Sequence, residues 1–317
     1  MNTVSRTRFL RLLIGSLLTG AALLAPAHAT LLVYEGFAGY TAGQLVGQNP
    51  NANTIGLNTS VGYYDDGVST TRTLNYTLQT TGLTFGSLAT GGGALAFSAG
   101  TNVIGADISI GATAFTGTLW TSYLVNLSAR GTAANDGAVI RIGDKPSDSS
   151  GGHFNSWADA RPAVASTNVA VSNGTTAPTT NGTAALSLNT TYIIINSFTA
   201  VGSPLSAGTP GVAKLWALTE SQYSAFLSAG GDEAALNAAS VTATATNTVT
   251  SGTFTFSSND SFALVTVNDA GTYDELRFGS SLADVTPAAV PEPAATAAIM
   301  GLGCSLVLLR RRELRRR

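Results

Sequence analysis

The run Gly117-Thr118-Leu119-Trp120-Thr121-Ser122-Tyr123-Leu124-Val125-Asn126-Leu127 decides the fold. Aromatic and β-branched residues recur along it, and none of its residues is charged. A run of this kind is typical of a strand that is buried near the centre of a sheet. We therefore expect a central strand over residues 117–127, with further strands on both sides of it.

Other short apolar or alternating runs predict those further strands, because Gly, Pro, Asn and Asp residues bound them. The runs cover residues 31–37, 73–78, 94–98, 138–143, 163–171, 187–197, 212–218, 253–256, 262–267 and 273–278. We expect the strand over 212–218 to pair with the strand over 187–197. The polar stretch 172–183 predicts an exposed loop. About a dozen short strands favour an all-β, antiparallel β-sandwich.

One segment of the body predicts a helix. Thr219 can cap it, and Gln222, three residues further on, completes a capping box. Tyr223 and Phe226 fall on one face of this helix, and a glycine pair then ends it. A second short turn is expected over residues 232–239. We expect this single helical excursion to lie over one edge of a sheet.

The first 29 residues predict a secretory signal peptide. Three arginines precede the apolar run 12–24, and Ala27 and Ala29 are small residues at the positions that signal peptidase reads. The alternative is a transmembrane helix, but the run is short and ends at a cleavage-like triplet. We expect cleavage after Ala29, which makes signal peptidase a partner and leaves His153 as the one histidine of the mature body.

The last 30 residues, 288–317, predict a second targeting signal. Val290-Pro291-Glu292-Pro293 interrupts helix and strand alike, and residues 294–309 form an uncharged apolar run. As a helix this run is about 24 Å long, short for a hydrocarbon core of about 30 Å unless flanking arginines extend its reach. A basic cluster follows and should stay in the cytoplasm: Arg310, Arg311, Arg312, Arg315, Arg316 and Arg317.

This order of Pro-Glu-Pro, short apolar helix and terminal arginines resembles the PEP-CTERM sorting signal of exported bacterial proteins. The resemblance implies recognition and removal of the tail by exosortase, a membrane protease. It also implies a transient inner-membrane anchor and a final place at the cell surface, or in an extracellular matrix of exopolysaccharide and biofilm. The alternative is a plain C-terminal membrane anchor that stays attached.

The body between the two signals is acidic and almost free of thiols. Residues 30–291 contain seven basic and 16 acidic residues, which gives a net charge near −9. No basic cluster remains there to attract nucleic acid or anionic membranes. Cys304, the single cysteine, lies in the tail, so the body forms no disulfide. About 260 residues can bury a full core, and we expect one domain over residues 30–287.

The body also resembles the LamG-like, concanavalin A-like jelly-roll proteins that carry PEP-CTERM tails. Residues 32–37 with 40–43 are similar to the family's opening, and residues 273–279 with 283–287 to its closing strand. Weaker similarity covers residues 92–97, 119–124, 140–145 and 214–218. The resemblance implies a concanavalin A-like jelly roll, and such a sandwich hosts many functions.

Catalytic motifs are weak in this body. A Ser-His-Asp hydrolase would need His153 as its base, but no elbow motif surrounds any serine. A glycosidase needs two acids that flank one bond. Asp274 and Glu275 are adjacent on a predicted strand, so we expect their side chains to point to opposite faces, where they cannot flank one bond. We instead expect Glu275 to form an ion pair across a strand with an arginine. We expect no enzyme, and a secreted glycan-active hydrolase is the alternative.

No metal site or cofactor follows from the sequence. Calcium is a candidate, since three loops offer oxygen ligands without any fixed spacing: Asp65-Asp66, Asp144 with Asp148, and Asn259-Asp260 with Asn268-Asp269. Asn and Asp are also common in turns simply because they bond to their own backbone.

Carbohydrate binding needs aromatic rings beside polar groups. Trp157, Tyr63 and Tyr64 occur in polar, loop-like contexts and are the candidate ligand residues, whereas Trp120 and Trp216 lie in apolar strands and predict core positions. The sequence therefore favours an exported envelope or matrix protein whose sandwich is structural, adhesive or carbohydrate-binding, with extracellular polysaccharide as a candidate partner and no nucleic acid.

Overall fold

The computed structural model describes most of the body between the two predicted terminal signals. The described residues are 31–60, 62–65, 76–86, 88, 90–98, 104–109, 114–129, 137–144, 157–161, 168–172, 179–181, 186–238, 244–250, 253–256, 260–267 and 269–286. The predicted signal peptide (residues 1–29), the predicted sorting signal (residues 288–317) and His153 lie outside them. No helix in the described ranges is long and apolar enough to cross a membrane.

The larger of two sheets contains nine of the described strands in the order β14-β13-β12-β7-β16-β5-β4-β2, and β1 also pairs with β16. Its strand pairs are antiparallel. The strands are β1 (Leu31–Glu35), β2 (Gly43–Gln44), β4 (Tyr76–Gln79), β5 (Ala94–Phe97), β7 (Gly117–Ala129), β12 (Thr191–Val201), β13 (Gly211–Leu218), β14 (Thr244–Val249) and β16 (Ala270–Gly279).

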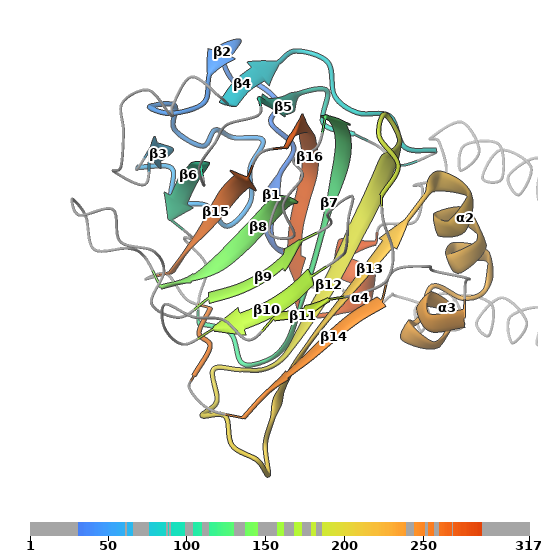
Figure 1. Ribbon diagram of the computed structural model, residues 1–317. Helices are drawn as coiled ribbons and strands as arrows, with labels where there is room; N and C mark the ends of the chain where they lie inside the picture. The colour runs from blue at the N-terminus through green and yellow to red at the C-terminus, as the bar shows by residue number, and fades with distance from the viewer. Residues whose placement is uncertain are drawn as a thin grey trace, which may run out of the picture.

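The smaller sheet contains seven described strands in the order β11-β10-β9-β8-β15-β6-β3. They too pair antiparallel. They are β3 (Tyr64–Asp65), β6 (Ile104–Ser109), β8 (Gly137–Asp144), β9 (Trp157–Arg161), β10 (Asn168–Ser172), β11 (Thr179–Asn181) and β15 (Asp260–Val267). Figure 1 shows β8 to β11 lying over the nine-stranded sheet, so the expected all-β antiparallel sandwich is confirmed.

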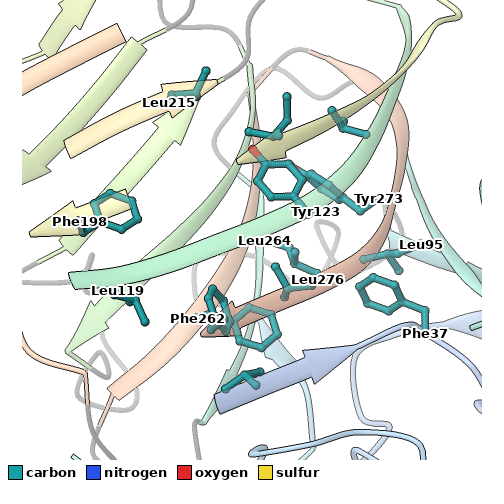
Figure 2. Close-up of a cluster of buried hydrophobic side chains, with 14 of the residues drawn as sticks. Phe37, Leu95, Leu119, Tyr123, Phe198, Leu215, Phe262, Leu264, Tyr273 and Leu276 are labelled. Atoms are coloured by element: carbon teal, nitrogen blue, oxygen red, sulfur yellow. The ribbon is translucent and has the colours of Figure 1, made fainter. Parts of the chain in front are cut away.

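The main hydrophobic core lies between the two sheets. The larger sheet contributes Tyr123, Phe198 and Tyr273, and the smaller sheet contributes Phe262 and Leu264. All five residues are buried, and Figure 2 shows them gathered between strands of both sheets. Burial of large side chains, at about 25 cal/mol per Å² of apolar surface removed from water, is what holds the sheets together.

A second core covers the opposite face of the larger sheet. Three helices contribute to it: α2 (Glu220–Ser228), α3 (Glu233–Ala238) and α4 (Leu282–Val285). Trp216 on β13 is fully buried there and stacks on Trp120 of β7, with ring centroids 5.8 Å apart. Its indole N–H donates to Asn237 Oδ1 at 3.1 Å. Trp120 and Trp216 are therefore core residues, as predicted.

The central strand explains why this sheet is buried on both faces. Leu119, Tyr123 and Val125 of β7 belong to the first core, whereas Trp120 and Leu124, at alternate positions, belong to the second. Strand β7 pairs with β12 on one side and with β16 on the other. The uncharged run thus occupies the central position that its composition predicted.

The predicted helix and the predicted pairing of the two strands beneath it are also confirmed. Thr219 and Gln222 form the capping box of α2, and Tyr223 and Phe226 are its buried residues. Asp232 caps α3 through a 2.7 Å bond from the backbone N–H of Ala235. Strands β12 and β13 pair as expected. The helices pack on the outer face of β12 and β13, and Figure 1 shows α2 and α3 beside β13.

Several short strands differ from the expectation. β2, β3, β6, β9 and β14 were not predicted, and β11 lies within the stretch 172–183 that was predicted to be a loop. The strand predicted over residues 253–256 is wrong, since that segment forms only an isolated bridge at Thr253. Helix α4 was not predicted either, since its segment was grouped with the closing strand. These segments are short and rich in Ala, Thr and Asn, so cross-strand pairing and packing determine their conformation more than local propensity does.

Candidate functional site

A β-bulge in β16 brings two carboxylates to one side of the larger sheet. The register between β16 and β7 shifts between Asp274 and Arg277, and Glu275 has a φ of 54°, which is rare for a residue with a side chain. Both acids contact the same segment, residues 82–91, through different backbone N–H groups. The prediction that their side chains lie on opposite faces is therefore wrong, because the bulge interrupts the alternation.

Asp274 is fully buried and bonded on both oxygens. Its Oδ2 accepts the backbone N–H of Leu83 at 2.7 Å, and its Oδ1 accepts the N–H of Glu275 at 2.7 Å. Burial, and then the neighbouring carboxylate of Glu275, raise the pKa of Asp274 to about 8. Asp274 is thus a neutral acid over much of the physiological range, and it ties segment 82–91 to β16.

Glu275 is the centre of a hydrogen-bonded ion pair. Its carboxylate accepts the hydroxyl of Tyr34 at 3.1 and 3.2 Å and the N–H of Gly91. Arg277 donates to it at 2.5 Å and lies over the ring of Tyr34, 5.0 Å from the centroid. The expected ion pair exists, but it runs along one strand and not across two. A Cβ atom at position 91 would lie 3.0 Å from the Tyr34 hydroxyl, so this close approach favours glycine there.

A second buried carboxylate, Glu35, lies in the core between the sheets. Its oxygens accept the hydroxyls of Tyr40 at 2.5 Å and Tyr63 at 2.7 Å, and the N–H of Phe37 at 2.7 Å. Burial raises the pKa of Glu35 and of both tyrosines. Tyr63 is only 1% exposed. The prediction that its ring is available to a sugar is wrong, because the ring packs in the core and its hydroxyl is bonded to Glu35.

These two carboxylate clusters hold chain segments together. In the described part of the chain, protein donors contact every carboxylate oxygen of Glu35, Asp274 and Glu275. General acid–base catalysis needs a carboxyl group within hydrogen-bond reach of a substrate. Since these residues are at most 1% exposed, their geometry fits a structural role.

The sequence does carry a signal for these clusters, namely acidic residues within otherwise apolar strands. Glu35 ends an apolar strand, and Asp274 and Glu275 interrupt another. An acid inside an apolar strand is rarely buried without a partner. Their partners, however, come from distant segments such as residues 82–91, so the sequence could indicate the burial but not the contacts.

The outer face of the seven-stranded sheet carries a different set of residues. We define this face as the one opposite to Phe262 and Leu264, which lie in the core. Successive residues of a strand alternate between faces, and direct cross-strand partners share one. Ser261 and Ala263, which alternate with Phe262 and Leu264 on β15, therefore lie on the outer face, and so do their register partners on the other strands.

Two rows of register partners cross this outer face. One row is Ser172, Trp157, Gly143, Ser261 and Ser109. The other is Thr179, Ala170, Asp159, Arg141, Ala263, Asp107 and Tyr64. Trp157 and Tyr64 therefore lie on one face with two acids and an arginine between them. Both aromatic residues are in strands and not in the loops where the sequence had suggested them.

The candidate calcium loops are only partly described. Asp144 and Asp260 are direct register partners at the ends of β8 and β15, although the sequence had placed them in separate candidate loops. Asp65 is in β3, and Asp269 is buried. Asp66, Asp148, Asn259 and Asn268 lie outside the described residues. No group of three or more metal-ligating His, Cys, Asp or Glu residues occurs within the described ranges.

Comparisons with known proteins give no family for this chain. No protein-family model and no curated protein matches it. Among solved structures, the globular domain of T. cruzi calreticulin matches at 8% identity and a TM-score of 0.38, over 81% of this chain and 90% of that one. The exoplasmic domain of VIP36 in its Ca²⁺-bound form matches at 10% and 0.35, over 68% and 86%. Lectin II from Ulex europaeus matches at 8% and 0.34, over 61% and 88%. These similarities are too low to assign a fold family or a ligand.

Proposed function

We propose that this chain is an exported bacterial protein of the cell envelope or extracellular matrix, with a non-catalytic sandwich that binds carbohydrate. In this proposal, signal peptidase removes residues 1–29, the apolar helix anchors the chain briefly in the inner membrane, and an exosortase acts on the tail after residue 287. The body is a concanavalin A-like jelly roll that then resides at the cell surface or in the matrix.

The outer face of the seven-stranded sheet is the observation that carries the binding proposal. Register places Trp157 and Tyr64 there together with Asp107, Arg141 and Asp159. A sugar ring offers apolar C–H faces and many hydroxyls, which suit aromatic rings beside groups that donate and accept hydrogen bonds. The described helices belong to the core of the other sheet and not to this face.

The non-catalytic part of the proposal is supported by the buried acids. Asp274 has the raised pKa of a general acid and Glu275 is beside it, which favours a hydrolase as the second candidate. Their oxygens are nevertheless bonded to the protein itself. We therefore expect the Glu275→Gln variant and the wild-type protein to give the same reading in an assay of reducing-sugar release.

The test is a glycan array with purified residues 30–287, wild type and Trp157→Ala. Binding to neutral glycans that falls in the variant, with no reducing sugar released, supports the proposal. Sugar release that disappears in Glu275→Gln supports the hydrolase instead. Absence of binding to every glycan contradicts the binding function.

Export and C-terminal sorting are tested separately, by measuring the intact mass of the protein. Protein recovered from the native host's envelope and medium should lack residues 1–29 and the residues after about Pro293. A mass that retains Cys304 and the terminal arginines contradicts sorting by cleavage and supports a permanent anchor.

A further inference from the structure

We propose that the ligand of the outer face is an extended, uncharged polysaccharide chain that runs across the strands from Trp157 toward Tyr64. The inference rests on the proposed carbohydrate-binding function and adds the class, length and direction of the ligand. It is carried by the register of the seven-stranded sheet, which fixes where the two aromatic residues lie relative to one another.

The distance between the two aromatic positions sets the length of the ligand. Trp157 is on β9 and Tyr64 is on β3, and three strands, β8, β15 and β6, lie between them. Four strand spacings of about 4.8 Å separate their backbones by roughly 19 Å. One sugar ring cannot reach both positions, whereas a chain of several sugar units can contact both at once.

The residues between them set the direction. Asp159 is two residues beyond Trp157 on β9, and Arg141, Ala263, Asp107 and Tyr64 follow it in register, one strand at a time. Polar residues therefore occupy every register position along this line, which is perpendicular to the strands, except that of Ala263. A chain along this line would meet one row position per strand, while a chain parallel to the strands would meet only one of the two aromatic residues.

The charges on this face favour an uncharged ligand. Asp107 and Asp159 are matched by Arg141 and by Arg161, which is two residues beyond Asp159 on the same face. The body as a whole is acidic, with a net charge near −9 over residues 30–291. An anionic polymer would be repelled by this field at low salt, and the register positions named above hold as many acids as arginines.

The experiment measures affinity against chain length. Isothermal titration of residues 30–287 uses glucose and the malto-, cello- and laminari-oligosaccharides of two to eight units, with polygalacturonate as the anionic polymer. The variants are Trp157→Ala, Tyr64→Ala and both together. Trp157→Phe and Tyr64→Phe retain a ring, and Leu188→Ala, at a partly exposed residue before β12, is the control for handling and folding.

The expected result is an affinity that rises with length in at least one neutral series and is weak for glucose. Each single alanine variant should weaken binding of the eight-unit chain roughly 3- to 10-fold, the range expected for loss of one aromatic contact. Disaccharide binding should change far less, because a disaccharide reaches only one ring at a time. The phenylalanine variants should retain most of the affinity.

Three results would overturn the inference while the binding function stands: equal affinity for two and eight units, tighter binding of polygalacturonate, or loss of long-chain binding in only one of the two alanine variants. If no neutral series binds wild-type protein, the proposed function itself is contradicted. Circular dichroism of every variant establishes that the fold is intact before affinities are compared.

Discussion

The two sheets use their polar residues in different ways. On the nine-stranded sheet, Asp274, Glu275 and Arg277 are buried beneath segment 82–91 and are bonded to one another or to backbone groups. On the seven-stranded sheet, Asp107 and Asp159 are register partners in a row that also contains Tyr64. The acids of the larger sheet therefore bond within the protein, whereas Asp107 and Asp159 occupy register positions on the face that we propose binds the ligand.

This contrast follows from what covers each sheet. Three helices and segment 83–88 pack on the outer face of the larger sheet, so a polar group there must find a partner within the protein. The described helices contribute to the core on the far face of the larger sheet and not to the core between the two sheets. A mutation in the larger sheet should therefore change stability, and a mutation on the outer face of the smaller sheet should change binding.

Replacing a tryptophan with alanine in each of the two sheets should give the largest difference in the free energy of unfolding. Trp216→Ala removes a fully buried ring that stacks on Trp120 and donates to Asn237. We expect it to lower the free energy of unfolding by about 5 kcal/mol. Trp157→Ala should change it by no more than about 0.5 kcal/mol. Urea unfolding of both variants measures the difference, and equal losses would show that both tryptophans are core residues.

Arg277→Met tests the buried ion pair and should have the next largest effect. The variant leaves Glu275 buried at 0% side-chain exposure without its cation. We expect a loss of about 3 kcal/mol, since breaking one partner of a buried pair leaves an uncompensated charge. The double variant Arg277→Met/Glu275→Gln is the control and should recover part of that stability. A loss below about 1 kcal/mol in the single variant would contradict this assignment.

Asp274→Asn tests the same region through pH. The folded-state pKa of Asp274, about 8, lies above its ordinary value of 3.8, so the folded state holds the proton more tightly. The stability contributed by this proton is full below about pH 4 and is lost as pH rises through 8. The asparagine variant should lack this loss, which has a slope of at most about 1.4 kcal/mol per pH unit. Thermal unfolding at pH 5, 7 and 9 measures it, and parallel pH curves would contradict the raised pKa.

The parts of the fold that were predictable are those whose local signals agree with their tertiary environment. Strand β7 is uncharged and lies at the centre of a sheet that is buried on both faces. Helix α2 carries its capping box in four consecutive residues, Thr219 to Gln222. In both cases the residues that determine the element are neighbours in the chain.

The bulge and the row alignment were not predictable, because they depend on pairing between distant strands. Glu275 adopts a positive φ within β16, where β1 and β7, from distant parts of the chain, pair with the same strand. Tyr63 and Tyr64 are adjacent and look alike in sequence, yet Tyr63 bonds to Glu35 in the core while Tyr64 pairs with Asp107. Composition alone cannot separate such neighbours, since alternation sends them to different faces.

Asp144→Asn tests the end of the seven-stranded sheet and should have the smallest effect. Asp144 and Asp260 are direct partners across β8 and β15, and like charges opposite one another destabilise a sheet. In calcium-free buffer, the variant should therefore be more stable than wild type by about 0.2–1 kcal/mol. Chemical unfolding with EDTA measures this, and Asp159→Asn, whose partner is Arg141, is the matched control that should show no gain. A loss of stability in Asp144→Asn would mean that the pair is held by an additional favourable contact, and repeating the measurement with added Ca²⁺ would then show whether that contact is a cation.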